Sequence, residues 1–197
     1  MKKRFAFFLA LILLLSACGK APVGTAGAYP DTVIIREPTE DNPLQFDFYE
    51  ALNNIYIAET KVSFPRIITD LGEGFRLEGM PLDVEGGGLV ADGLRYNGVD
   101  VGGVILEGTA DNYDDSSKIV HLMLSAFDEN SEQHGIYTFR VGDVVSHEDI
   151  IAYFGVPTAE GKHSLVYELE ESKKHIKFLF NTVSEEQTLL WVAISMF

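Results

Sequence analysis

Two stretches of the chain share one pattern of hydrophobic and polar positions. Residues 118–127 and residues 188–197 match apolar with apolar at almost every place at an offset of 70, and both end in Ser-x-Phe. Both are short, largely apolar runs, which we interpret as β-strands. The chain is therefore expected to contain the same kind of strand twice.

A helix signal precedes each of these strands. Residues 65–72 have a proline early and a glycine at the end, whereas residues 146–157 have a serine cap, acids in the first turn, and a final glycine and proline. Both contain Ile-Ile-x-x-(Leu/Phe)-Gly, at an offset of 83. The excess over the strand offset, 83 − 70 = 13 residues, is expected in the glycine-rich stretch 79–88, as a mobile or closely approached loop.

A hairpin is expected between the helix and the last strand of each half. Asn97-Gly98 tolerates the positive φ angles of a type I′ turn, and residues 170–173 separate two alternating runs. The predicted fold class is α+β, with two tandem units that each contain a short helix and about three antiparallel strands, and with helices covering one face of the sheet. The first unit, with an N-terminal extension, takes residues 44–135, and the second takes residues 136–197.

Strand alternation also predicts which side chains face the helices. The expected core positions are Ile176, Phe178, Phe180, Leu190, Val192, Ile194, Met196, Leu165, Tyr167 and Leu169, with Val120, Leu122 and Leu124 from the first unit. The opposite face is expected to carry Trp191, Lys177, His121 and Arg95, with His175, Leu189, Ala193, Val166, Glu168 and Asp100. A β-bulge would exchange the two faces, because the side-chain period of a strand is two.

The only tryptophan lies among charged side chains on this opposite face, which is typical of a partner-binding anchor. Trp191, His121, Lys177 and Arg95 are therefore the candidate partner-binding residues. An alternative stays open, in which residues 46–57 cover Trp191 and make it part of the core.

The N-terminus has the order of a bacterial export signal. Cations at positions 2–4 precede an apolar run of 11 residues, which is shorter than the roughly 20 residues that span a bilayer. The next residues, Leu15-Ser16-Ala17-Cys18, resemble the bacterial lipobox, in which the cysteine is diacylated and the chain is cut before it. The resemblance implies a signal peptide at residues 1–17 and a lipid on Cys18.

Residues 18–43 are small, polar and interrupted by prolines, so they are expected to form a flexible, lipidated tether. Within it, Val33-Ile34-Ile35 is expected as a stray strand or a docking contact. Because Cys18 is the only cysteine, the chain forms no intrachain disulfide.

Acidic residues outnumber basic ones by 30 to 15, a formal net charge of −15. Without residues 1–17, which carry three cations, the charge is −15 − 3 = −18. A chain with this charge lacks the basic footprint of a nucleic-acid-binding protein.

No familiar catalytic motif is present. The sequence lacks Gly-x-Ser-x-Gly, His-Glu-x-x-His, Cys-x-x-Cys, a phosphate loop and a dinucleotide fingerprint. The five histidines have no ligand spacing and are expected at surface or sheet positions. Residues 111–115 are expected to form a solvated turn, because Tyr113 and Ser116 stand where a calcium loop needs an oxygen ligand and a glycine. No enzyme activity, cofactor or metal site is predicted.

The tandem helix–strand pattern, the helix stop at Gly155-Val156-Pro157 and the hairpin that carries Tyr167 resemble the fold family of the beta-lactamase inhibitory protein and of the small lipoprotein of the outer-membrane assembly machine. The resemblance covers about residues 62–197, although the chain lacks the inhibitor's paired cysteines. It implies a protein-binding module with a curved sheet and a helical layer. No binding residue and no inhibitory activity are carried over.

These features predict a lipid-anchored protein on the outer side of a bacterial membrane that binds another protein of the cell envelope. The alternative is a lipoprotein that binds a small ligand or an ion through residues 79–88 or residues 111–115.

Overall fold

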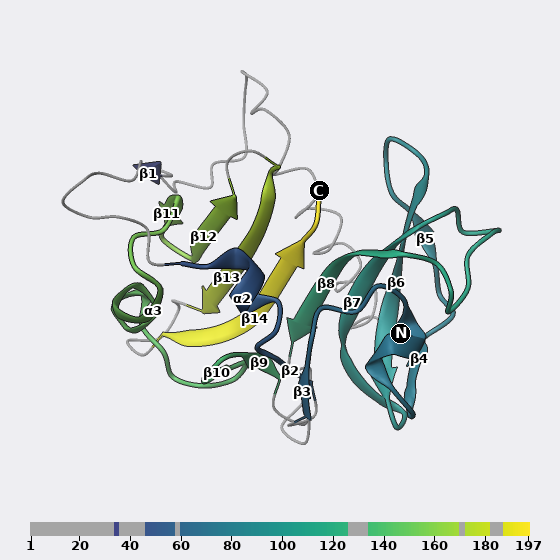
Figure 1. Cartoon of the computed structure of the whole chain (residues 1–197), viewed down its shortest axis with the longest axis horizontal. Coiled ribbons are helices and arrows are strands. Elements are labelled where there is room, and N and C mark those ends of the chain that lie inside the picture. The colour runs from purple at the N-terminus through teal and green to yellow at the C-terminus, as the bar shows by residue number, and fades with distance from the viewer. Residues whose placement is uncertain (1–33, 36–45, 58–59, 126–133, 170–171, 182–186) are drawn as a thin grey trace.

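Two antiparallel sheets make up most of the molecule, as the computed structural model in Figure 1 shows. The structure describes residues 34–35, 46–57, 60–125, 134–169, 172–181 and 187–197. The predicted signal peptide, Cys18 and most of the predicted tether lie outside the described residues.

The large sheet is a path of nine strands, with a tenth strand beside it. Across the sheet the path runs β1 (Ile34–Ile35), β11 (Ala159–Gly161), β12 (Ser164–Leu169), β13 (Lys174–Asn181), β14 (Thr188–Ser195), β8 (Ile119–Ser125), β7 (Val99–Glu107), β6 (Leu89–Tyr96) and β4 (Phe75–Leu77). The tenth strand, β5 (Leu82–Asp83), pairs with β6 on the same side as β4. β14 and β8 therefore meet in the middle of the sheet.

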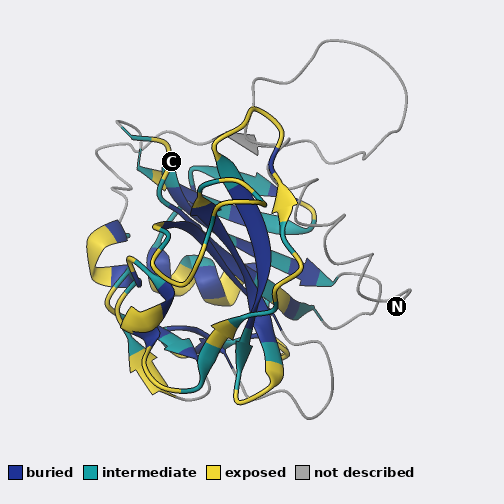
Figure 2. Cartoon of the chain, turned by 90° about the vertical axis from the view of Figure 1, so that its right-hand side faces the viewer, coloured by how far each residue is buried: buried dark blue, intermediate teal, exposed yellow. Residues whose placement is uncertain are grey.

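A second layer packs against one face of the large sheet, which we call the inner face. The layer contains a four-stranded sheet and three short helical segments: β10 (Phe139–Arg140), β9 (Gly135–Ile136), β2 (Ile55–Ile57), β3 (Thr60–Val62), α2 (Phe48–Ala51), α3 (His147–Phe154) and the 3-10 helix η1 (Ile68–Leu71). Its apolar side chains and those of the inner face form one core. Figure 2 shows the buried residues concentrated in the central strands and the exposed ones mainly in the surrounding turns and loops.

The expected α+β class, with two helix-and-strand units covered by helices, is wrong. The described residues contain only two α-helices, of four and eight residues, and these are too short to cover so wide a sheet. The helix signal at residues 65–72 yields a single 3-10 turn, Ile68–Leu71, which ends at Gly72. Much of the covering layer is instead the four-stranded sheet.

Several local signals are confirmed. α3 begins after Ser146, whose Oγ accepts a hydrogen bond from the Asp149 amide (3.1 Å), and ends at Gly155, where φ is 81°. In the β6–β7 turn both Asn97 (φ 48°) and Gly98 (φ 86°) have positive φ, as a type I′ turn requires. The short strand expected around Ile34 and Ile35 is β1.

The inner face holds most of the predicted core. Its buried or core-packed residues include Ile176, Phe178, Phe180, Val192, Ile194, Met196, Leu165, Tyr167, Leu122 and Leu124. A bulge between Leu179 and Phe180 shifts the register of β13 against β14. As a result Leu189 is fully buried and Leu190 is 39% exposed, the opposite of the predicted faces.

A second bulge lies between β7 and β8, at the step from Ile105 to Leu106. It turns Val120 away from the inner core and into a smaller apolar cluster on the other side of the sheet. The predicted core position of Val120 is therefore wrong, although Leu122 and Leu124 are placed as expected.

Candidate functional site

The other side of the large sheet, which we call the reverse face, is organised in rows that cross the strands. One row runs through Gly93, Gly103, Met123, Ala193, Lys177 and Val166. The row on one side of it contains Ala91, Ile105, His121, Ser195, His175 and Glu168. The row on the other side contains Ser125, Trp191, Leu179 and Ser164. Opposite side chains in such rows are close neighbours.

Three of the four candidate residues come together around Ala193. Lys177 is directly opposite Ala193, Trp191 lies two positions before it on β14, and His121 lies diagonally across on β8. Trp191 and Lys177 are partly exposed, whereas His121 is only 5% exposed. Strand alternation therefore predicted correctly that these three side chains lie on one face of the sheet.

Arg95 lies on the reverse face but away from this group. It belongs to β6, two strands beyond β8, and its guanidinium is engaged within the chain. Nε donates to the Asp100 carboxylate (2.6 Å), and Nη2 lies 3.3 Å from Glu78 Oε1. Arg95 and Asp100 do share one face, as expected, but they form a separate ion-pair cluster.

The alternative that residues 46–57 cover Trp191 is wrong. Phe48, Ala51, Ile55 and Ile57 all belong to the inner core, on the opposite face of the sheet. Trp191 instead packs against the reverse-face cluster, which consists of Val84, Ala91, Ile105, Val120, Met123 and Ala193, with Leu89 beside them.

His121 is a buried, neutral imidazole. Among the described residues, neither of its ring nitrogens has a hydrogen-bond partner. Burial lowers the pKa of His121 to about 3, and repulsion from His175 adds to the effect. An unpaired buried polar group costs free energy, so His121 destabilises the fold where it stands.

The expectation for the histidines holds only in part. His121 and His175 do lie in strands, yet both are buried, and His134 and His147 are buried outside the strands. His147 Nδ1 lies 3.7 Å from the Glu160 carboxylate. Within the described ranges, no group of three or more His, Cys, Asp or Glu side chains could hold a metal ion.

Residues 79–88 and residues 111–115, the two stretches of the alternative ligand site, meet at Asp92. The sequence analysis did not identify Asp92. This carboxylate is fully buried and accepts hydrogen bonds from the amides of Gly79 and Met80 (both 3.1 Å) and from the Tyr113 hydroxyl (2.7 Å). Burial, and next the bond to Asp92, raises the pKa of the Tyr113 phenol. Because donors of the chain itself occupy Asp92, the junction is a structural tie between loops. An acid at an inward position of an apolar strand was its sequence signal.

The glycine-rich stretch 79–88 is not a closely approached loop. A Cβ at Gly79, Gly86, Gly87 or Gly88 would meet no atom within 4 Å. All four have φ between 75° and 106°, so the backbone conformation explains the glycines. The stretch also contains β5, and Val84 joins the reverse-face cluster.

No family model, no curated protein and no solved structure matches the chain. The resemblance to the beta-lactamase inhibitory protein fold family therefore stays a prediction. In the part of the chain that the structure describes, every helix is too short or too polar to cross a membrane.

Proposed function

We propose that this chain is a lipoprotein anchored through Cys18 to the outer side of a bacterial membrane, and that the reverse face of its large sheet binds another protein of the envelope. The observation that supports the binding face is the grouping of Trp191 and Lys177 around Ala193, on the face opposite the second layer. The sequence from Leu15 to Cys18 supports the anchor.

The physical argument for the face rests on the environment of Trp191. Trp191 packs against the reverse-face cluster, which includes Met123 and Ala193, while its side chain stays partly exposed. A fixed aromatic ring beside a cation is the kind of group that contributes most to protein interfaces. His121 is buried, so we assign partner contact to Trp191 and Lys177 and a supporting position to His121.

Photo-crosslinking tests the binding face. A photoreactive amino acid replaces Lys177 in one variant and Lys61 in a matched control. Lys61 is an exposed lysine of β3, in the second layer, on the other side of the large sheet. In cells that make the full chain, we expect a discrete adduct from position 177, which disappears when Trp191→Ala is added. Equal adducts from positions 177 and 61 would show that the reverse face is not the binding surface.

Fatty-acid labelling tests the anchor. We expect the wild-type chain to incorporate labelled palmitate and to sediment with membranes, whereas Cys18→Ala should lose both properties. Incorporation of palmitate by Cys18→Ala would refute the anchor at this residue.

A further inference from the structure

The four-stranded sheet of the second layer directs one row of side chains away from the core. Ile55 and Ile57 of β2 are fully buried in the inner core, so Tyr56 between them points outward. The strand pairing places one residue of each other strand in line with Tyr56, on the same face of the sheet. We call this line the outer row, and it consists of Lys61 (β3), Tyr56 (β2), Gly135 (β9) and Arg140 (β10).

The glycine in this row allows Arg140 to reach Tyr56. A Cβ at Gly135 would lie 1.8 Å from the carbonyl oxygen of Phe139, so no larger residue fits there. The Arg140 side chain crosses β9 at this point, and its Cζ lies 4.1 Å from the centre of the Tyr56 ring. Lys61 is the direct neighbour of Tyr56 on the other side. Two cations therefore flank one tyrosine.

The outer row holds several hydrogen-bond donors that the described part of the chain does not use. Nη1 of Arg140 donates to the carbonyl oxygens of Tyr137 (2.5 Å) and Phe139 (3.5 Å). Within the described residues, its Nε and Nη2 have no acceptor, and neither Arg140 nor Lys61 forms an ion pair. The same holds for the Tyr56 hydroxyl. Lys61 is exposed and the other two side chains are partly exposed.

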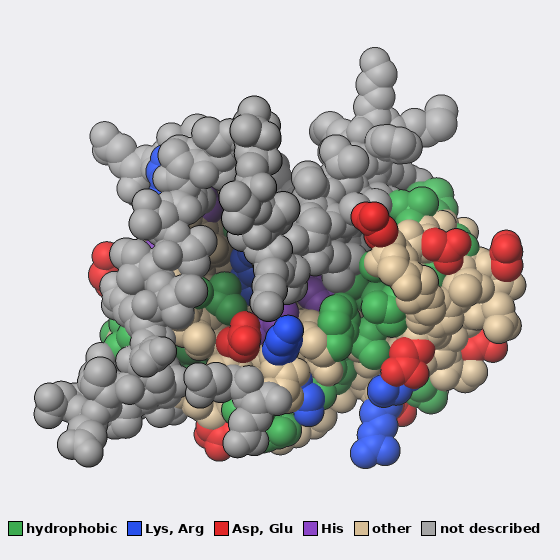
Figure 3. Space-filling view, turned by 90° about the horizontal axis from the view of Figure 1, so that it is seen from above, with side chains coloured by type: hydrophobic (Ala, Val, Ile, Leu, Met, Phe, Trp, Pro, Cys, Tyr) green, Lys and Arg blue, Asp and Glu red, His purple; other side chains and the backbone are tan. Residues whose placement is uncertain are grey.

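The local charge of this sheet is opposite to that of the whole chain. The strands β2, β3, β9 and β10 contain two cations and no acidic residue, whereas the chain has a formal net charge of −15. Asp143 follows three residues after Arg140, but its carboxylate accepts from the Arg140 backbone amide (3.2 Å). Figure 3 shows acidic side chains over another part of the surface, at the right-hand end of the molecule.

We propose that the outer row is a binding site for a phosphate group. Nε and Nη2 of Arg140 form a planar fork that fits two oxygens, and Lys61 and the Tyr56 hydroxyl can each donate to a further oxygen. A carboxylate has only two oxygens, which the fork alone would satisfy, whereas a phosphate group offers enough acceptors for all of these donors. The ligand is either a free phosphate or the phosphate of a lipid headgroup.

This site is independent of the proposed binding face. The outer row belongs to the second layer, which packs on the inner face of the large sheet, so it lies on the other side of the molecule from Trp191. Because its ligand is not a protein, position 61 still serves as the crosslinking control.

Nuclear magnetic resonance of the full chain, labelled with nitrogen-15 and kept in a non-ionic detergent, tests the site. The Nε–H signal of Arg140 is identified by its absence from Arg140→Gln. Inorganic phosphate is then titrated at constant ionic strength, with chloride as the balancing anion. We expect this signal to shift and to saturate with phosphate. A signal that does not saturate, or that chloride shifts equally, would overturn the proposal.

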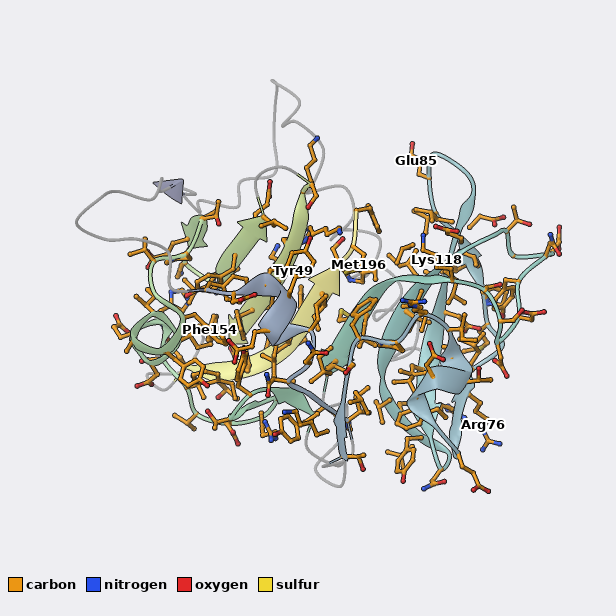
Figure 4. The ribbon with its side chains drawn as sticks, viewed as in Figure 1. Tyr49, Arg76, Glu85, Lys118, Phe154 and Met196 are labelled. Atoms are coloured by element: carbon orange, nitrogen blue, oxygen red, sulfur yellow. The ribbon has the colours of Figure 1, made fainter. Side chains whose placement is uncertain are left out.

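Three variants test the donors through the same signal. Lys61→Gln should raise the dissociation constant for phosphate roughly three- to fivefold, as expected for an exposed charge pair. Tyr56→Phe keeps the ring under Arg140 but removes the hydroxyl, so it should raise the constant about twofold or more. Lys118→Gln is the control, because Lys118 lies 2.6 Å from Glu107 on the large sheet and its loss changes the net charge equally. Figure 4 shows Lys118 in the right-hand half of the molecule, whereas Figure 1 shows β2, β3, β9 and β10 at the lower middle.

Lys118→Gln should leave the dissociation constant unchanged. Equal weakening by Lys61→Gln and Lys118→Gln would show that phosphate responds only to net charge, and would overturn the site. Glycerophosphoglycerol, the deacylated headgroup of phosphatidylglycerol, identifies the source of the ligand. Tighter binding of glycerophosphoglycerol than of inorganic phosphate would support the site with a lipid headgroup as its ligand, and the reverse order would support it with a free phosphate. Absence of binding by both would overturn the proposal.

Discussion

Trp191 and Phe178 lie on neighbouring strands but belong to different apolar clusters. Phe178 is fully buried, and its ring lies near those of Phe139, Phe154 and Tyr167. Trp191 is partly exposed on the reverse face. Phe178→Ala should therefore lower the free energy of unfolding by about 3–5 kcal/mol, as for large core aromatics, and Trp191→Ala should lower it by clearly less.

Urea unfolding followed by circular dichroism measures both variants, since Trp191 fluorescence is lost in one of them. An equal loss of stability in the two variants would show that Trp191 is a core residue, and the proposed binding face would lose its anchor.

Asp92 is the residue whose role is most clearly structural. An amide in its place puts an NH2 group where chain donors now point, so Asp92→Asn should cost about 1–3 kcal/mol of unfolding free energy. Asp100→Asn is the control, because the Asp100 side chain is 38% exposed and exposed ion pairs are worth about 0–1 kcal/mol. Urea titrations that show no greater loss for Asp92→Asn than for Asp100→Asn would contradict the loop-tying role.

At the scale of the element, α3 depends on its N-terminal cap. Ser146 Oγ accepts from the Asp149 amide, and the Asp149 carboxylate accepts from the Ser146 amide (2.9 Å). Ser146→Ala should therefore lower stability by about 1 kcal/mol. Ser116→Ala, at an exposed loop position, should change it by less than about 0.5 kcal/mol. The midpoint of thermal unfolding compares them, and two equal shifts would mean that the cap contributes nothing measurable.

The strands show which side-chain positions could be predicted from the sequence pattern. Alternation placed Phe178, Val192 and Trp191 on their observed faces, because those stretches keep an unbroken period of two. It failed at Leu189 and Leu190, just across the bulge after Leu179. A bulge inserts one residue without a distinctive residue type here, so the alternation alone gives no sign of it. The neighbourhood of Trp191 and Lys177 was therefore predictable from alternation. The error at Leu189 could not be avoided, because alternation does not reveal a bulge.

The second layer was missed because its strands are very short. β9 and β10 have two residues each, and β2 and β3 have three, which is too few for a period to show. They form through contacts with residues distant in sequence, such as the pairing of Ile55 with Ile136. Helix signals were by contrast easy to see, so they suggested a helical layer that the molecule does not have.

At the scale of the whole molecule, buried histidines make stability depend on pH. Burial lowers the pKa of His121 to about 3 and that of His134 to about 4, and it also lowers the pKa of His147. In the unfolded chain these histidines have a pKa of about 6.5. As the pH falls below that value the unfolded state takes up the protons first, so the free energy of unfolding should decrease from about pH 7 toward pH 5.

Urea titrations at pH 7.5, 6.5, 5.5 and 5.0 measure this dependence, above the range where most carboxylates titrate. The slope should be smaller in His121→Leu, which also removes the unpaired nitrogens. A wild-type stability that is flat between pH 7.5 and 5.0 would contradict the buried, neutral state of these histidines.

The pairing of β8 with β14 in the middle of the large sheet has a consequence for the order of folding. Residues 121–125 of β8 can pair only with residues 191–195 of β14 on this side. The two halves of the sheet therefore join only after the intervening chain has been made. Until then β8 and β13 are unpaired edges of apolar strands, which are prone to pair with other chains. Contacts of such long sequence separation form slowly. We therefore expect a chain that stops before Thr188 to aggregate instead of forming a smaller stable domain.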